Sequence, residues 1–340
     1  TYTESSAASD VYKRQGLPFV EGITVAIRNN GKPVLVARYL ADLVLFDCDS
    51  IACLSGTDRV LDGLGLGQGS QASVAIRLDG RPIISYWTNV DNGLKVYDCA
   101  DVACTTGTAR ALEAGTMSAT RVAVRADGRP LISYSISIGG GAKSLKLYSC
   151  SDANCTSGVG RVLDADGGSD SSISLPPASA PVIAYFSSGD RRADQLKFYE
   201  CADADCASGS ATVLTNTPNS PSGLSMVIRS DGKPAIAYYN PTSQVLKLYD
   251  CGSPDCRSGT SRDIDSDVNS GFGVDLAISP GRSAGDTLMM VYSRDTSGTN
   301  SSETELVLFS CSDPCSESSI LSRNFALSND LAIQPGASSR

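Results

Sequence analysis

The sequence predicts an all-β protein, a β-propeller in which six four-stranded blades are visible. Three observations support this: a unit of about 50 residues recurs six times, each unit carries four strand signals, and helix signals are missing. Units of this length with four antiparallel strands are typical of propeller blades, which bury their apolar faces only by stacking on one another.

The repeat is easiest to follow in the motif Leu-x-apolar-aromatic-x-Cys, which first runs from Leu43 to Cys48. The first cysteines of successive copies are 51, 51, 51, 50 and 60 residues apart, and a polar insert at 293–304 lengthens the last gap. The predicted blades cover about 16–64, 65–115, 116–168, 169–219, 220–269 and 270–323. We expect residues 324–340 to supply either the first strand of a seventh blade or a strand that closes the ring.

Residues 1–15 do not follow the repeat. The run SSAASDVYKRQ, from Ser5 to Gln15, resembles a translated sequencing-adapter remnant. We expect a disordered polar segment here and leave it out of the fold. No signal peptide is visible in it.

Each element of the second copy illustrates the unit. The first strand contains Val74–Arg77, and Asp79-Gly80 suits a tight hairpin because glycine accepts positive φ. Pro82 opens the second strand, where a missing N–H does little harm. Ile83–Tyr86 then supplies β-branched and aromatic residues, and Leu94–Tyr97 forms the third strand. A short fourth strand follows the cysteines.

The twelve cysteines fall into six local pairs. They are Cys48/Cys53, Cys99/Cys104, Cys150/Cys155, Cys201/Cys206, Cys251/Cys256 and Cys311/Cys315. Zinc would need four converging ligands, whereas successive pairs lie about fifty residues apart. We therefore interpret the pairs as disulfides, which requires the chain to turn back between them because bonded cysteines have Cα atoms within ~7 Å.

Two consequences follow from this interpretation. Disulfides indicate an extracellular, cell-surface or periplasmic location. Each bond closes a short loop, so it should contribute only about 2 kcal/mol. We expect the bonds to make the hairpins rigid locally rather than to hold distant parts of the chain together.

Composition excludes several classes of function. The formal net charge of −9 disfavours nucleic acid as a partner, because phosphate backbones are repelled. The chain has no histidine, which excludes Ser-His-Asp catalysis and imidazole metal sites. No apolar run approaches the ~18 residues of a membrane-spanning helix, so we expect no membrane insertion. We expect a monomeric propeller.

The repeat pattern also resembles a known group of proteins. Asp-Gly-x-Pro-x-Ile-x-Tyr, then Leu-Lys-x-Tyr-x-Cys and a second cysteine, resembles repeats of uncharacterised bacterial secreted or surface proteins with sialidase-like or integrin-like propellers. The resemblance covers residues 16–340 and implies the architecture without an assigned activity. The Asp box of sialidases, Ser-x-Asp-x-Gly-x-Thr-x-Trp, has no match, and Asp79-Gly80 belongs to a different motif.

Four arginines share one repeat position: Arg28, Arg77, Arg125 and Arg229. They could form an anion-binding ring around a central channel, because guanidinium groups pair with carboxylates, and sialidases grip a carboxylate with three arginines. Alternatively, each pairs with an acid or a backbone carbonyl of its own or an adjacent blade. A side chain repeated in several blades usually serves the blade, so we favour the second interpretation.

Aromatic residues also recur. Five tyrosines share one position, which indicates blade packing: Tyr86, Tyr134, Tyr185, Tyr238 and Tyr292. At the next position, Trp87, Phe186 and Tyr239 either stack on sugar rings at a blade edge or pack against the neighbouring blade. We favour packing.

The run Asp263-x-Asp265-x-Asp267-x-Asn269 resembles the opening of a calcium loop. It lacks the glycine at the sixth position and the glutamate at the twelfth that an EF-hand loop needs. Calcium is thus one interpretation and a solvated acidic linker the other, and no further cofactor is expected.

Three hypotheses for function follow. The first is a non-catalytic extracellular propeller that binds or scaffolds glycans or proteins. The second is a sialidase-like glycoside hydrolase or lyase, which needs two acids at a defined separation. The third is a purely structural repeat within a larger surface protein. Because the sequence shows repetition rather than a singular acidic cluster, we favour the first and expect specific function where the copies differ.

Overall fold

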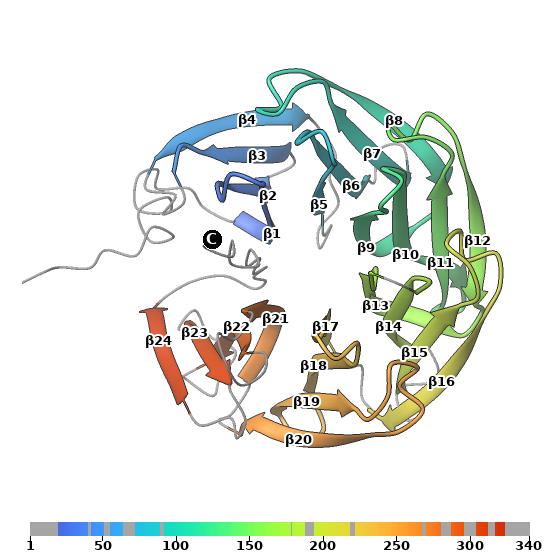
Figure 1. Ribbon diagram of the computed structural model, residues 1–340, viewed down its shortest axis with the longest axis vertical. Coiled ribbons are helices and arrows are strands. Elements are labelled where there is room, and N and C mark those ends of the chain that lie inside the picture. Colours follow the sequence, from blue (N-terminus) through green and yellow to red (C-terminus); the bar gives the residue numbers. More distant parts are fainter. Residues whose placement is uncertain are drawn as a thin grey trace, which may run out of the picture.

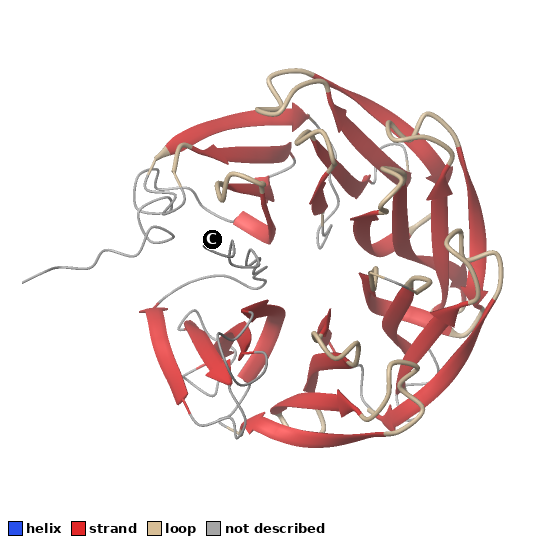
Figure 2. Cartoon of the chain, viewed as in Figure 1, coloured by secondary structure: helices blue, strands red, loops and turns tan. Residues whose placement is uncertain are grey.

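The computed structural model describes most of the repeat region. The described residues are 20–39, 42–50, 55–63, 72–88, 92–177, 179–187, 194–217, 222–266, 270–279, 287–295, 304–311 and 317–323. The flanking segments 1–15 and 324–340 lie outside them, so the expectations for both segments stay predictions. Among the described residues every regular element is a strand (Figure 2), and no helix suited to crossing a membrane occurs in these ranges.

The strands form six antiparallel four-stranded sheets, each in simple sequence order. Blade 1 comprises β1 (Val20–Ile27), β2 (Pro33–Tyr39), β3 (Asp42–Cys48) and β4 (Gly56–Asp62). Blade 2 comprises β5 (Ser73–Ile76), β6 (Pro82–Thr88), β7 (Gly93–Cys99) and β8 (Gly107–Ala114). Blade 3 comprises β9 (Met117–Val124), β10 (Pro130–Gly139), β11 (Ala142–Cys150) and β12 (Gly158–Asp164).

The second half repeats this order. Blade 4 comprises β13 (Gly167–Ser174), β14 (Val182–Ser187), β15 (Gln195–Cys201) and β16 (Gly209–Asn216). Blade 5 comprises β17 (Ser222–Ile228), β18 (Pro234–Asn240), β19 (Val245–Cys251) and β20 (Gly259–Asp265). Blade 6 comprises β21 (Ser270–Ser279), β22 (Thr287–Asp295), β23 (Thr304–Cys311) and β24 (Glu317–Arg323).

The blades are arranged around a central axis, with the first strand of each innermost and the fourth at the rim (Figure 1). Consecutive inner strands contact one another from β1 through β5, β9, β13 and β17 to β21. The predicted all-β propeller fold is therefore confirmed, with six blades in the described part of the chain.

The turns between first and second strands follow the sequence closely. Gly31, Gly80, Gly128 and Gly232 adopt φ between 81° and 84°. The side chain one residue before each glycine accepts a hydrogen bond from the amide two residues further on, as when Asp79 Oδ1 accepts from Arg81 at 3.0 Å. This pairing of a turn-forming Asx residue with glycine explains why Asp-Gly recurs.

The loop between third and fourth strands, here called the cysteine turn, is closed by a disulfide in blades 2 to 5. The bonded cysteines have Cα atoms 4.8 to 4.9 Å apart, which confirms that the chain turns back between them. Cys48 is also disulfide-bonded, while Cys53, Cys315 and the side chain of Cys311 lie outside the description. The four bonds are Cys99–Cys104, Cys150–Cys155, Cys201–Cys206 and Cys251–Cys256.

The second cysteine of each turn has an uncommon backbone conformation. A turn closed by two cysteines gave no reason to expect a left-handed residue, because side chains other than glycine rarely adopt positive φ. In the structure the amide of each second cysteine donates to the carbonyl three residues before it, so a left-handed cysteine ends a tight turn. The φ values lie between 51° and 53° at Cys104, Cys155, Cys206 and Cys256.

The disulfides close local hairpins, as the sequence predicts, and their second cysteines also belong to the packing between blades. Cys155, Cys206 and Cys256 are fully buried. Cys155 belongs to the cluster that contains Ile83 and Leu94 of blade 2. Cys206 lies in the cluster with residues of blade 3, and Cys256 lies in the cluster with residues of blade 4. Each disulfide therefore contributes apolar contact with the preceding blade as well as closing its own hairpin.

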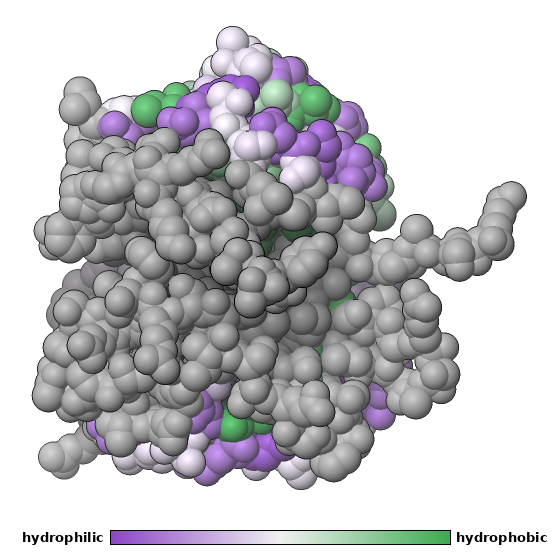
Figure 3. All heavy atoms as spheres, turned by 90° about the vertical axis from the view of Figure 1, so that its left-hand side faces the viewer, coloured by the Kyte–Doolittle hydropathy of each residue, from purple (hydrophilic) through white to green (hydrophobic). Residues whose placement is uncertain are grey.

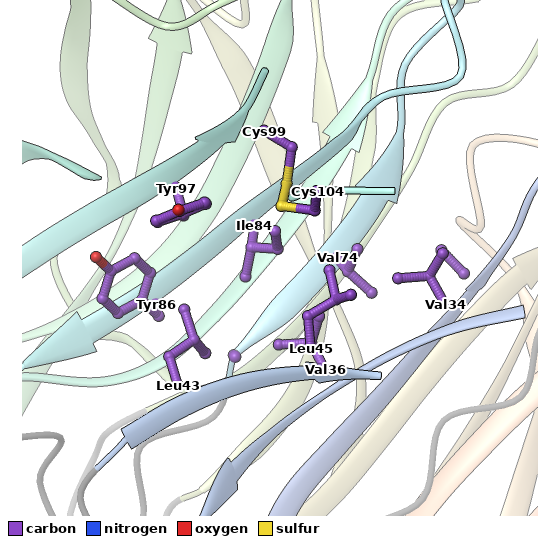
Figure 4. Packing of buried hydrophobic residues seen from close by; sticks show 12 residues of the cluster. Val34, Val36, Leu43, Leu45, Val74, Ile84, Tyr86, Tyr97, Cys99 and Cys104 are labelled. Carbon is purple, nitrogen blue, oxygen red and sulfur yellow. A yellow bond between two sulfur atoms is a disulfide. The ribbon is translucent and has the colours of Figure 1, made fainter. Parts of the chain in front are cut away.

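The apolar core as a whole lies between blades rather than inside one. Figure 4 shows the cluster between blades 1 and 2, where Val34, Val36 and Leu45 face Val74 and the Cys99–Cys104 disulfide. β6 is buried along its whole length because neighbouring blades cover both of its faces. The described surface in Figure 3 is largely hydrophilic, with a few scattered hydrophobic residues.

Candidate functional site

The repeated arginines lie in contacts between blades. Arg28 Nη1 donates to Asp47 Oδ1 at 2.5 Å in its own blade, and Nη2 donates to the Val102 carbonyl of blade 2 at 2.7 Å. Arg77 is 2% exposed and pairs with Asp98 of its own blade and Asn154 of blade 3.

The other two arginines follow this pattern in part. Arg125 donates to Cys150 in its own blade and to Ala204 and Asp205 of blade 4. Arg229 pairs with Asp250 of its own blade. These are the contacts that the second interpretation predicts.

In blades 1 to 3 a second arginine, on the fourth strand, completes the contact. Arg59 donates to the Ala103 carbonyl at 3.0 Å, Arg110 to the Asn154 carbonyl at 3.2 Å, and Arg161 to the Asp205 carbonyl at 3.3 Å. Two arginines of one blade thus hold the cysteine turn of the next. We call this pair the arginine clamp, and it joins blade 1 to 2, 2 to 3 and 3 to 4.

The repeated tyrosines also join blades. Tyr86 donates to Asp62 of blade 1 at 2.6 Å, and Lys95 donates to the same carboxylate at 3.3 Å. Burial, together with the bond to the neighbouring acid, raises the pKa of Tyr134 and Tyr185. These hydroxyls are fixed donors and poor nucleophiles. The trios equivalent to Tyr86–Asp62–Lys95 are Tyr134–Glu113–Lys146 and Tyr185–Asp164–Lys197.

The three aromatics at the next position are in the interior. Trp87 is 7% exposed and packs with Met117 and Val122 of blade 3. Phe186 is fully buried and meets the Tyr238 ring edge-on, with centroids 6.3 Å apart. Tyr239 is 3% exposed. In this conformation no sugar ring can reach their faces, which agrees with the packing interpretation.

The acidic run in blade 5 is occupied by other contacts. Lys247 binds Asp263, and Asp265 Oδ2 accepts from Tyr292 at 2.6 Å. Asp267 lies outside the described residues. Within those residues no group of three or more acidic or cysteine ligands is placed to hold a metal ion.

One arginine differs from all of these. Ser73 shows the usual role of its inner-strand position, since its Oγ accepts from the Val122 amide of the next blade at 3.1 Å. In blade 3 this position holds Arg121, which is half-buried, and its guanidinium donates to no other side chain or carbonyl in the described part of the chain. The residues in the same register in the other five blades are Thr24, Ser73, Ser172, Ser225 and Asp275.

Two further charged groups accompany Arg121. Asp170, near the start of β13, is 7% exposed and accepts from the Ser171 amide at 2.9 Å. Burial raises the pKa of Asp170, against the lowering effect of the Arg121 and Lys143 charges and of the Ser171 and Leu224 amides. Lys143, near the start of β11, donates to Ser118 at 3.1 Å, and burial lowers its pKa. We call Arg121, Lys143 and Asp170 the blade 3/4 cluster.

The cluster lies beside a projecting hairpin. β10 has ten residues, whereas the second strands of blades 1, 2, 4 and 5 have six or seven. Its turn, Gly139–Gly141, has φ of 64° to 95°, and Ile138 beside it is 58% exposed. Antiparallel alternation puts this hairpin, Lys143 and Asp170 on the face opposite the cysteine turns. Charged groups that are buried or half-buried next to an extended loop are typical of binding sites.

Sequence reasoning did not find this cluster. Arg121 directly precedes the first-strand motif Val122–Arg125, so its signal was present as a departure from the Ser or Thr of four of the other five copies. Asp170 lies in blade 4, where the copy of the repeat has drifted. Their proximity depends on stacking of β9 against β13, which the strand pattern alone does not give.

Comparisons with known proteins bear on the fold. No protein-family model matches the chain, and no curated protein matches it. The SapL1 lectin in complex with alpha methyl fucoside has a TM-score of 0.55 at 11% identity, over 89% of this chain and 96% of that one. The Fusarium graminearum alpha-L-arabinofuranosidase has a TM-score of 0.50 at 12% identity, over 82% and 89%.

A puromycin hydrolase structure gives a TM-score of 0.54 at 14% identity and covers 98% of this chain. The matched region is 51% of that enzyme, so the chain spans about half the length of this relative. These likenesses show the fold alone. The chain is a β-propeller. Binding proteins and enzymes both occur among its structural neighbours, so the role of this chain has to be argued from the residues of the blade 3/4 cluster.

Proposed function

We propose that this chain is a non-catalytic binding module of an extracellular or cell-surface protein, and that it binds glycans at the blade 3/4 cluster. The disulfides support the compartment, because such bonds persist in oxidising surroundings. The lectin among the structural neighbours supports the ligand class.

Arg121 carries this proposal, because it forms no hydrogen bond or ion pair within the described part of the chain. Arg28, Arg77, Arg125 and Arg229 are all held by acids, carbonyls or amides. Arg121 has five N–H donors and, among the described residues, no acceptor for them. Sugar hydroxyls and carboxylates are acceptors that a half-buried guanidinium can bind.

Glycoside hydrolysis is the second candidate, and Asp170 is the observation in its favour. A carboxyl whose pKa is raised by burial can serve as a general acid. Hydrolysis also needs a second carboxyl at a defined distance. The charges that act on Asp170 are the cations Arg121 and Lys143, an arrangement better suited to holding a ligand than to the two-acid mechanism.

A glycan array tests the proposal. The oxidised chain should bind a subset of glycans, and Arg121→Gln should abolish or strongly reduce that binding. Arg81→Gln is the matched control, because Arg81 pairs with Asp79 in an exposed turn on the opposite face. Equal loss in both variants, or no binding by the wild type, would refute glycan binding at this cluster. Release of free sugar by the wild type, lost in Asp170→Asn, would favour the hydrolase.

A further inference from the structure

Resting on the proposed function, we infer that the blade 3/4 cluster takes the anionic group of an acidic sugar, a carboxylate or a sulfate, rather than a neutral sugar. The inference concerns the charge of the ligand and the residues that recognise it: Arg121 and Lys143 as the binding cations, and Asp170 as the group that sets their net charge.

The balance of charge in the cluster favours an anion. Arg121 comes from β9, Lys143 from β11 and Asp170 from β13. With all three groups ionised, two positive charges face one negative charge, and a single anionic group on a ligand neutralises the excess. A neutral ligand would leave that excess charge partly buried, which is unfavourable.

Binding of an acidic ligand depends on the local charge of the cluster, because the chain as a whole is acidic. The whole chain carries a formal charge of −9, so its overall field repels an acidic ligand. In the described part of the chain, other basic groups near blade interfaces are tied to acids or carbonyls, including Lys146 to Glu113, Lys197 to Asp164 and Arg161 to the Asp205 carbonyl. An acidic sugar therefore depends on Arg121, whose planar fork binds oxyanions through two parallel hydrogen bonds.

Asp170 is held in place independently of the ligand. Its carboxylate accepts from the Ser171 amide in its own strand and from the Leu224 amide of β17 in blade 5. The charged groups that act on it are Arg121 from β9 and Lys143 from β11. Protonation of Asp170 would therefore raise the net charge of the cluster by one and leave the two cations in place.

A binding measurement with matched oligosaccharides tests the inference. The probes are a uronic-acid oligosaccharide, the same oligosaccharide with its carboxyls reduced to alcohols, and a sulfated oligosaccharide, each measured by calorimetry at pH 7. The wild type should bind one or both acidic probes at least about tenfold more tightly than the neutral one, as expected for charge-assisted hydrogen bonds. The two acidic probes identify whether carboxylate or sulfate is preferred.

Three variants separate the roles of the residues. Arg121→Gln should weaken acidic binding by about tenfold or more, and Arg121→Lys should recover part of the loss because it restores the charge without the fork. Asp170→Asn should tighten acidic binding at pH values above the Asp170 pKa, and it should remove the increase in affinity that the wild type shows as pH falls through that pKa. The control, Arg81→Gln, should change nothing.

The outcomes also separate the inference from the proposed function. Equal affinity for the acidic and the neutral probe, with both lost in Arg121→Gln, would overturn the inference and leave glycan binding at this cluster intact. Binding that is unchanged in Arg121→Gln would overturn both. Because Asp170→Asn removes the acid that faces Arg121 and Lys143, its thermal unfolding is measured beside its binding, which checks that a change in affinity does not reflect unfolding.

Discussion

Restoring the missing acid between blades 4 and 5 should stabilise the ring. At the interfaces between blades 1 and 2, 2 and 3, 3 and 4, and 5 and 6, the fourth strand of one blade supplies an acid that binds the repeated tyrosine of the next blade. These acids are Asp62, Glu113, Asp164 and Asp265. Each of these acids pairs in register with the leucine that opens its third-strand motif. In blade 4 the residue in that register is Thr215, opposite Leu196.

The neighbouring side chains have adjusted to this loss. Tyr238 binds Ser261 of its own blade at 3.1 Å, and Lys247 pairs with Asp263, also of its own blade. Blade 4 also lacks both residues of an arginine clamp, having Pro176 and Thr212 at those positions. Among the described residues, this interface is held by apolar packing of Phe186 against blade 5 and by hydrogen bonds that include Met226 N–H to Ser172 Oγ at 3.1 Å.

Thr215→Asp should therefore rebuild the trio with Tyr238 and Lys247. A hydrogen bond to a carboxylate contributes about 1.5–3 kcal/mol, and the lysine pair adds at most ~1 kcal/mol because the equivalent acids are 17% to 27% exposed. Loss of the present Tyr238 and Lys247 contacts and desolvation of the new carboxylate offset part of this. We expect a net gain of about 1 kcal/mol, or roughly 1–2 °C in Tm for a chain of this size.

The assay is thermal unfolding of the oxidised protein at pH 7 and low salt. Asp164→Thr, which copies the blade 4 arrangement into the interface between blades 3 and 4, is the matched reverse variant. It should cost about 2 kcal/mol because the fully buried Tyr185 loses its acceptor. A lower Tm for Thr215→Asp together with an unchanged Tm for Asp164→Thr would refute the role assigned to the trio.

Three more predictions concern the residues that hold the blades together. Arg77→Met should lower the free energy of unfolding by roughly 3 kcal/mol in denaturant titrations, because Asp98, 9% exposed, then keeps Arg110 as its one partner among the described residues. A loss below about 1 kcal/mol would contradict a buried clamp. Trp87→Ala should cost about 3–5 kcal/mol through the cavity it leaves, and unchanged stability with lost glycan binding would instead support sugar stacking. The double variant Cys99→Ser/Cys104→Ser should lose about 2 kcal/mol and still fold, whereas complete unfolding would show that a single cysteine turn is required for the ring.

Sequence reasoning reached the fold because the fold is repetitive. Strand signals, Asp-Gly turns and paired cysteines each report a local geometry, and six copies reinforce one another. The interior positions of Trp87, Phe186 and Tyr239 were already favoured by their apolar character. The pairing of repeated arginines with neighbours was favoured as well, since a side chain needed in every blade serves the blade.

The cysteine turns show where that reasoning stops. Spacing alone predicts that two cysteines five residues apart can meet, and the structure confirms it for four pairs. The positive φ of the second cysteine and its burial against the preceding blade depend on how the turn folds and how the blades stack. Neither property is visible in the spacing of the residues.

The functional cluster could not be reached in the same way. Arg121, Lys143 and Asp170 are separated by 22 and 27 residues and belong to three strands in two blades. Each is an ordinary polar residue in the sequence. Only the stacking of β9 against β13 shows that Arg121 shares its surroundings with a buried acid, and only its contacts show that it differs from the paired arginines.

A crystal structure of the chain with a bound acidic oligosaccharide tests the central claim most directly. That claim is that the repeated residues hold the blades together, and that the blade 3/4 cluster, whose residues differ from those of the other copies, binds the ligand. We predict that the anionic group of the sugar lies between blades 3 and 4, within hydrogen-bond distance of the Arg121 guanidinium and near Lys143. A ligand bound equivalently in several blades, at the cysteine turns or along the rim, would contradict the account.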